Sequence, residues 1–197
     1  MTKFIVKNNS IEINKELNEL DLFVINLIKI IEKYTKYVLI SGYVSIFFGR
    51  ARSTEDVDMF IEKLAYQNFK KMFNELKSNG YELTEDEPES LYKDYLLDGL
   101  SINVWQKDFA LLRMEIKIAK TRTQKEQLEN PLIVILNEKY KLFFSQIESQ
   151  IAYKRTIAKS EKDLKDARHL EIVFDNLDKN KIEKYSKLFL EEFNKKV

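Results

Sequence analysis

Apolar positions recur with two different spacings in the first 135 residues. Residues 18–35 place their apolar side chains on one helical stripe, and a second such stripe precedes Gly80, so two amphipathic helices are predicted there. A short helix is predicted over 43–48, closed by Gly49. Short apolar or alternating runs predict the strands, which are 37–40, 56–61, 81–84, 93–97, 101–106, 109–118 and 132–136.

From residue 136 onward the spacing of apolar positions is helical. The predicted helices are 138–155, 161–176 and 180–194. Strands followed by a run of helices are typical of the α+β class. We therefore predict a mixed β-sheet domain with flanking helices over 1–135 and an α-helical C-terminal domain over 136–197. Residues 180–197 intersperse acids and bases, which predicts a solvated face.

The composition narrows the choice of partners. The chain has 197 residues, 33 of them Lys or Arg and 32 Asp or Glu, so its net charge of +1 gives no bulk attraction to nucleic acid or to anionic membranes. It has no cysteine, which excludes disulfides and thiolate metal sites. Its apolar runs are shorter than the ~20 residues that span a bilayer, and its first residues do not form a signal peptide. We expect a soluble, cytoplasmic protein with no membrane partner.

Two aspartates in the second predicted strand are candidate metal ligands. Asp56 and Asp58 are two residues apart, so they project from the same face of a strand, with Val57 and Met59 buried behind them. Neighbouring carboxylates repel each other unless a cation lies between them. Mg²⁺, or Mn²⁺, is the natural partner of oxygen ligands beside phosphates. The alternative is that both are surface acids flanking a strand.

A turn upstream of the aspartates predicts phosphate binding. The strand over 37–40 ends at Ser41-Gly42 and leads into a short helix. Backbone N–H groups at the start of a helix attract anions, and glycine allows a phosphate to approach the backbone closely. Together the turn and Asp56/Asp58 predict a site for a metal-bound nucleoside triphosphate.

These residues resemble a known family. Ser41-Gly42 followed by the segment 49–60, with its Gly-Arg, Thr and Asp-x-Asp, is similar to the nucleotidyltransferase superfamily that includes polymerase beta, and especially to the small AbiEii-type toxins. Residues 154–170 resemble the Lys, Arg and Lys-Asp-x-x-Asp helix in the C-terminal half of those proteins. The resemblance implies transfer of a nucleotidyl group to an acceptor hydroxyl on RNA, such as a tRNA end, or on a protein. It further implies a toxin–antitoxin role with an antitoxin partner.

The resemblance also assigns roles to single residues. Asp56 and Asp58 become the catalytic and metal-binding acids. The implied nucleotide-binding residues are Ser41, Gly42, Arg50, Arg52, Thr54, Lys154 and Lys162. Structural alternatives stand beside these roles. Arg50 and Arg52 could neutralise Glu55 or Asp56, Asp166 could pair with Arg168 or Lys162 or orient Lys154, Ser160 and Asp163 could cap a helix, and His169 could pack against the core.

A third carboxylate, usual in that superfamily, is not obvious in the sequence. The strand over 100–105 places Asn103 where the acid is expected, and an amide is a weaker ligand for a hard cation. Asp98, Asp108 and Glu115 are the candidates to replace it. The sequence therefore leaves two hypotheses open: an active nucleotidyltransferase, or a catalytically degraded protein of that fold that binds a nucleotide or a protein partner.

Overall fold

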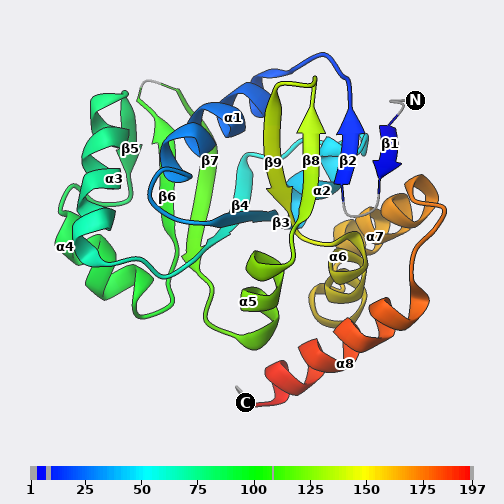
Figure 1. The fold of residues 1–197 in the computed structure, drawn as a ribbon. Coiled ribbons are helices and arrows are strands. Elements are labelled where there is room, and N and C mark those ends of the chain that lie inside the picture. Colours follow the sequence, from blue (N-terminus) through cyan, green and yellow to red (C-terminus); the bar gives the residue numbers. More distant parts are fainter. Residues whose placement is uncertain (1–3, 8–9, 108, 196–197) are drawn as a thin grey trace.

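The computed structural model describes residues 4–7, 10–107 and 109–195, and their strands form one mixed nine-stranded sheet (Figure 1). The strands follow the order β1-β2-β8-β9-β3-β4-β7-β6-β5. Three neighbouring pairs are parallel, namely β2 with β8, β9 with β3 and β4 with β7, and the other pairs are antiparallel. The bounds are β1 Phe4–Lys7, β2 Ser10–Ile13, β3 Tyr37–Ile40, β4 Asp56–Ile61, β5 Tyr81–Leu83, β6 Ile102–Gln106, β7 Phe109–Ile118, β8 Leu132–Leu136 and β9 Tyr140–Phe144.

Helices cover both faces of this sheet. Their bounds are α1 Glu19–Ile31, α2 Ser41–Phe47, α3 Tyr66–Ser78, α4 Pro88–Ser90, α5 Arg122–Glu129, α6 Ile147–Tyr153, α7 Glu161–Val173 and α8 Lys179–Asn194, with π-helical turns η1 Leu91–Leu96 and η2 Lys154–Ala158. The described elements that follow Ile147 are all helical. In Figure 1, α6, α7 and α8 lie together, and α5 approaches α8. No helix within the described ranges has both the length and the apolar character needed to cross a membrane.

The burial pattern of β4 separates the core from the candidate site. Val57, Met59 and Ile61 are buried in the main core, which α1 and α3 complete. Asp58 and Phe60 therefore face the other side of the sheet, because side chains alternate along a strand. On that side α5 packs through Leu128 in a smaller apolar cluster that includes Phe60. The alternation of buried and polar residues in β4 thus places Asp58 on the face of the sheet that carries α5.

Two predicted elements have a different secondary structure, and β1, β2, α4 and α5 have no counterpart in the sequence prediction. Residues 93–96 belong to the π-helical turn η1, which Leu97 caps, and not to a strand, because the buried residues Leu91, Tyr92 and Leu96 follow a helical spacing. Residues 140–144 form strand β9 and not the start of a helix over 138–155. Asn137 and Glu138 both have positive φ, which reverses the chain and pairs β9 with β8. The turn carries no glycine, so the sequence offered little warning of it.

Candidate functional site

The turn and the acids predicted from the sequence lie on neighbouring strands. Antiparallel pairing of β3 with β4 sets Ile40 opposite Asp58, so Ser41 follows directly beside this acid. Parallel pairing of β4 with β7 sets Glu115 in register with Asp58. Asp56 begins β4 and is exposed, whereas Asp58 is half-buried. We call Asp56, Asp58 and Glu115 the acid row.

The environment of Asp58 disfavours its charge. Burial raises the pKa of the Asp58 carboxyl above its ordinary value, and the negative charges of Glu115 and Asp56 raise it further. A hydrogen bond with the Ser41 side chain and the positive charge of Lys117 act in the opposite direction but do not cancel the rise. A cation beside Asp58 would therefore relieve an unfavourable interaction that the folded chain leaves in place.

A glutamine from α6 holds the turn after β3. Ser41 has a φ of 64°, a left-handed conformation that is unfavourable for a residue with a side chain. Its backbone N–H donates to Gln150 Oε1 at 3.1 Å, and Gln150 Nε2 donates to Ser145 Oγ at 2.6 Å. Gln150 thus occupies one N–H group at the start of α2. No local pattern in the sequence links Gln150 to a turn more than a hundred residues earlier, so this contact was not predicted.

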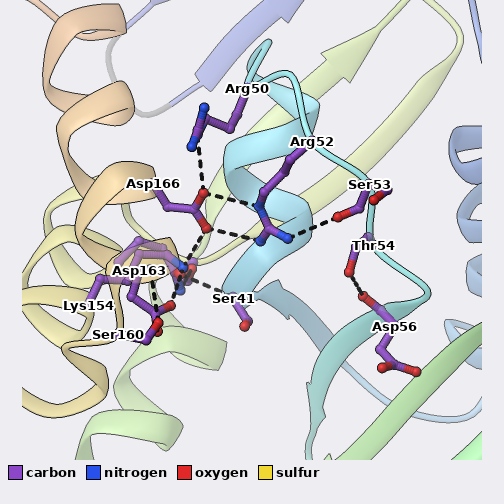
Figure 2. A network of polar contacts seen from close by, with 12 residues as sticks. Ser41, Arg50, Arg52, Ser53, Thr54, Asp56, Lys154, Ser160, Asp163 and Asp166 are labelled. Carbon is purple, nitrogen blue, oxygen red and sulfur yellow. Dashed lines mark hydrogen bonds and ion pairs between the residues drawn. The ribbon is translucent and has the colours of Figure 1, made fainter.

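Gly42 lies in close contact with a side chain from the loop before β4. A Cβ atom at this position would lie 2.3 Å from Arg52 Nη2, well inside contact distance. The sequence predicts a phosphate on the open side of this glycine, but in the structure the Arg52 guanidinium lies there. Arg52 is fixed by a two-point interaction with Asp166, with Nε 3.1 Å from Oδ1 and Nη2 3.0 Å from Oδ2 (Figure 2).

Asp166 is the centre of a buried ionic network, which we call the Asp166 cluster: Arg50, Arg52, Lys154, Asp163 and Asp166 (Figure 2). Lys154 Nζ lies 3.1 Å from Asp166 Oδ2 and 3.2 Å from Asp163 Oδ1, and Lys154 is only 1% exposed. Arg50 Nε lies 3.5 Å from Asp166 Oδ1. The cluster joins the loop before β4 to η2 and α7.

Asp163 has a favourable environment for its charge. Burial alone would raise the pKa of its carboxyl, but the hydrogen bond from Ser160 and the charge of Lys154 outweigh burial and lower the pKa. Ser160 also caps α7 by accepting from the Asp163 N–H at 3.1 Å, the capping role considered from the sequence. In this cluster, therefore, every acid has basic neighbours.

Three other predicted residues lie at the edges of these groups. Thr54 Oγ1 donates to the Asp56 carbonyl at 2.9 Å, so its hydroxyl stabilises the entry to β4. Lys162 is exposed in the first turn of α7. His169 is half-buried with Nε2 3.1 Å from the Phe48 carbonyl oxygen, which agrees with a packing role.

The position expected to hold the third acid lies one strand too far away. Asn103 is on β6, which pairs with β7 and not with β4, and Asn103 is in register with Glu115. Glu115 consequently lies between Asn103 and Asp58 in the sheet. The resemblance implied the third acid on the strand over 100–105, but β7 lies between that strand and β4 and carries Glu115, one of the candidates named to replace it. Asp98 lies in an exposed turn, and Asp108 lies outside the described residues.

A cavity of about 440 Å³ adjoins the acid row. Its polar side includes Asp58, Glu115 and Lys117, and Ser41 lies at its edge. Lys117 forms an ion pair with Glu115. The facing side is built by α5, α6, η2 and α8. The cavity is in the size range of pockets that bind small molecules.

The acids suit a hard cation but do not enclose one. Asp58 and Glu115 supply carboxylate oxygens, the ligands that Mg²⁺ prefers. Among the described residues, however, no three His, Asp or Glu side chains converge closely enough to form a metal site by themselves. A cation here would need further oxygen ligands, which water and a triphosphate can supply. Comparison of the chain with protein-family models and with curated proteins finds no match.

Proposed function

We propose that the protein is an Mg²⁺- or Mn²⁺-dependent nucleotidyltransferase that moves a nucleotidyl group from a nucleoside triphosphate to an acceptor hydroxyl and releases pyrophosphate. The observation that carries the proposal is the position of Asp58, between the Ser41 turn on one strand and Glu115 on the other, at the edge of a cavity. This arrangement supports the resemblance noted in the sequence, because it brings the Ser41-Gly42 turn and the aspartate pair together with a third acid, Glu115.

Each residue of the site would have a defined task. Ser41 orients the Asp58 carboxylate through its side chain, and Gln150 keeps Ser41 in place. Asp58 and Glu115 would hold the divalent cation, with Asp56 at the exposed end of the row. When bound, the cation would activate the acceptor hydroxyl and stabilise the charge that develops on the departing pyrophosphate. Arg52 would position the site indirectly, because its side chain keeps the loop before β4 packed against Gly42.

The acceptor that we propose is an RNA end, such as that of a tRNA, or a protein side chain. A role as the toxin of a toxin–antitoxin pair, with a separate antitoxin partner, follows from the resemblance. The test is to incubate the protein with each labelled nucleoside triphosphate, Mg²⁺ and a cell extract. We expect label to enter the RNA or the protein fraction.

The control variants make this assay decisive. Asp58→Ala should lower labelling by at least about a hundredfold, because an interaction of several kcal/mol with the cation is lost. Asp98→Asn removes an exposed acid away from the cavity and should label like the wild type. Equal labelling by Asp58→Ala and the wild type would refute the proposed site.

A second candidate is a non-catalytic nucleotide-binding or partner-binding protein of the same fold. Two contacts favour it: Lys117 is paired with Glu115, and the Arg52 guanidinium fills the space beside Gly42. Both contacts reduce the room for a cation and a phosphate. In this case the wild type would transfer no label with any triphosphate, and calorimetry would distinguish a nucleotide-binding protein, which binds a triphosphate, from a partner-binding protein, which does not.

A further inference from the structure

The cavity beside the acid row has a second, apolar side. Aromatic and aliphatic side chains from α6, η2 and α8 form this side: Tyr153, Ile157, Phe189 and Phe193. Tyr153 and Phe193 are 43% and 51% exposed, although they are large hydrophobic residues. Tyr153 also packs edge-on against Phe189, with ring centroids 5.3 Å apart. The cavity therefore places accessible aromatic rings opposite carboxylates.

A buried hydroxyl in this cavity has no partner among the described residues. Ser149 is 1% exposed and lines the cavity, and its Oγ makes no hydrogen bond to any residue that the structure describes. Buried polar groups are nearly always hydrogen-bonded, because an unmade bond costs about 1–3 kcal/mol. A ligand in the cavity would supply the missing bond.

Neighbouring polar groups of the cavity are already engaged. Gln150 binds Ser41 and Ser145, and Glu192 of α8 accepts hydrogen bonds from the Thr123 N–H and hydroxyl at 2.8 and 2.5 Å. These interactions hold α6 and α8 in position around the cavity. Ser149 differs from these residues because its hydroxyl can still form a hydrogen bond with a ligand in the cavity.

We propose that this side of the cavity is a binding subsite for a nucleobase. The flat heteroaromatic ring would stack on Tyr153 and Phe193, and its polar edge would bond to the Ser149 hydroxyl. Stacking on aromatic side chains tolerates any base, and a cavity of about 440 Å³ accommodates a nucleoside. The inference rests on the proposed function for the reaction at Asp58, and extends it by making α8 part of the substrate site. The base belongs either to the triphosphate or to the end of an RNA acceptor.

Calorimetry with the full chain tests the subsite. The probes are nucleosides without metal, nucleoside triphosphates with Mg²⁺, and inorganic tripolyphosphate with Mg²⁺. Tyr153→Ala should weaken nucleoside binding roughly fivefold to hundredfold, and Tyr153→Phe should preserve it. Ser149→Ala should weaken it roughly two- to tenfold.

Matched variants separate binding from folding. The Ser45 hydroxyl is also buried and has no hydrogen-bond partner within the described part of the chain, but Ser45 does not line the cavity, so Ser45→Ala should bind like the wild type. Phe193→Ala should weaken nucleoside binding, because Phe193 is one of the two proposed stacking residues. Leu190 is exposed on α8 outside the cavity lining, so Leu190→Ala is its control and should bind like the wild type.

The source of the base follows from competition. Displacement of a bound nucleoside by a triphosphate, together with weaker binding of tripolyphosphate, assigns the ring to the triphosphate. Simultaneous binding of both assigns it to the acceptor. The inference is overturned when nucleosides do not bind and Ser149→Ala and Tyr153→Ala leave triphosphate affinity unchanged. Asp58→Ala separates this result from failure of the proposed reaction, because it should abolish transfer and still bind nucleosides.

Discussion

Two neighbouring groups of charged residues in this protein are built in opposite ways. In the Asp166 cluster the carboxylates are surrounded by Arg50, Arg52 and Lys154, and the central acid is fully buried. In the acid row the carboxylates lie beside one another on β4 and β7, and burial together with like charge raises the pKa of Asp58. Figure 2 shows Asp166 at the centre of the network, while the Asp56 carboxylate points away from it.

This difference suggests that the Asp166 cluster stabilises the fold, whereas the acid row is available for a reaction. The charge of Asp166 is neutralised by basic side chains of the same chain, so no ligand is needed to balance it. Such ion pairs are suited to fixing the loop before β4 against α7. In the acid row Lys117 offsets only part of the negative charge, and an added cation would relieve what is left. Both groups derive from motifs that suggested nucleotide binding, yet their contacts assign Arg52 and Lys154 to the compensated group.

The largest expected effect is on stability, from the Asp166 cluster. Asp166→Ala should lower the free energy of unfolding by about 3–5 kcal/mol, because it leaves the buried Lys154 and the half-buried Arg52 without their common carboxylate. Denaturant unfolding measures the change. Glu161→Gln, which affects an exposed ion pair with Lys165 on the same helix, should remain close to the wild type. If both variants unfold alike, the cluster does not stabilise the fold.

A smaller effect, on the rate of nucleotidyl transfer, should show whether Glu115 or Asn103 occupies the third ligand position. Glu115→Gln should reduce nucleotidyl transfer by about ten- to a hundredfold, because it removes a charge next to Asp58. Asn103→Ala, one strand further away, should leave the rate near that of the wild type. Initial rates at saturating triphosphate provide the comparison. A loss confined to Asn103→Ala would restore the role that the sequence suggested for this residue.

The smallest effect concerns the pH dependence of stability. Because the pKa of Asp58 is raised in the folded protein, the folded state binds more protons than the unfolded state between the ordinary and the raised pKa. The free energy of unfolding should therefore fall as the pH rises through this interval. Asp58→Asn lacks this titration and should be more stable than the wild type above the interval, in metal-free buffer.

Thermal unfolding across pH tests this expectation, and Mg²⁺ provides the complement. The cation should raise the melting temperature of the wild type more than that of Asp58→Asn, since a ligand stabilises the state that binds it. Asp98→Asn serves as the control for removal of an exposed acid. Parallel pH profiles for the wild type and Asp58→Asn would contradict a raised pKa at this position.

Local patterns in the sequence were sufficient for many of the elements that hold the site. The apolar alternation around Asp56 and Asp58 predicted β4 and its two faces, and the buried run over 37–40 predicted β3. The helix stop at Gly80 is confirmed by its positive φ, as is the helix stop at Gly49. These features depend on side-chain period and on backbone freedom, both of which can be read within a few residues.

Long-range relations were decided only by the tertiary structure. The sequence contains Glu115, Gln150, Ser149 and Phe193, but no local pattern shows that they meet around one cavity. Strand order placed β7 beside β4 and moved Asn103 one strand away, since the partner of a strand depends on how the whole sheet is assembled. Likewise, the occupant of the space beside Gly42 is Arg52, because Asp166 on a distant helix fixes its guanidinium there. The spacing of apolar residues and the residues that form turns are local properties of a chain. Which charges neutralise one another depends on contacts between distant segments.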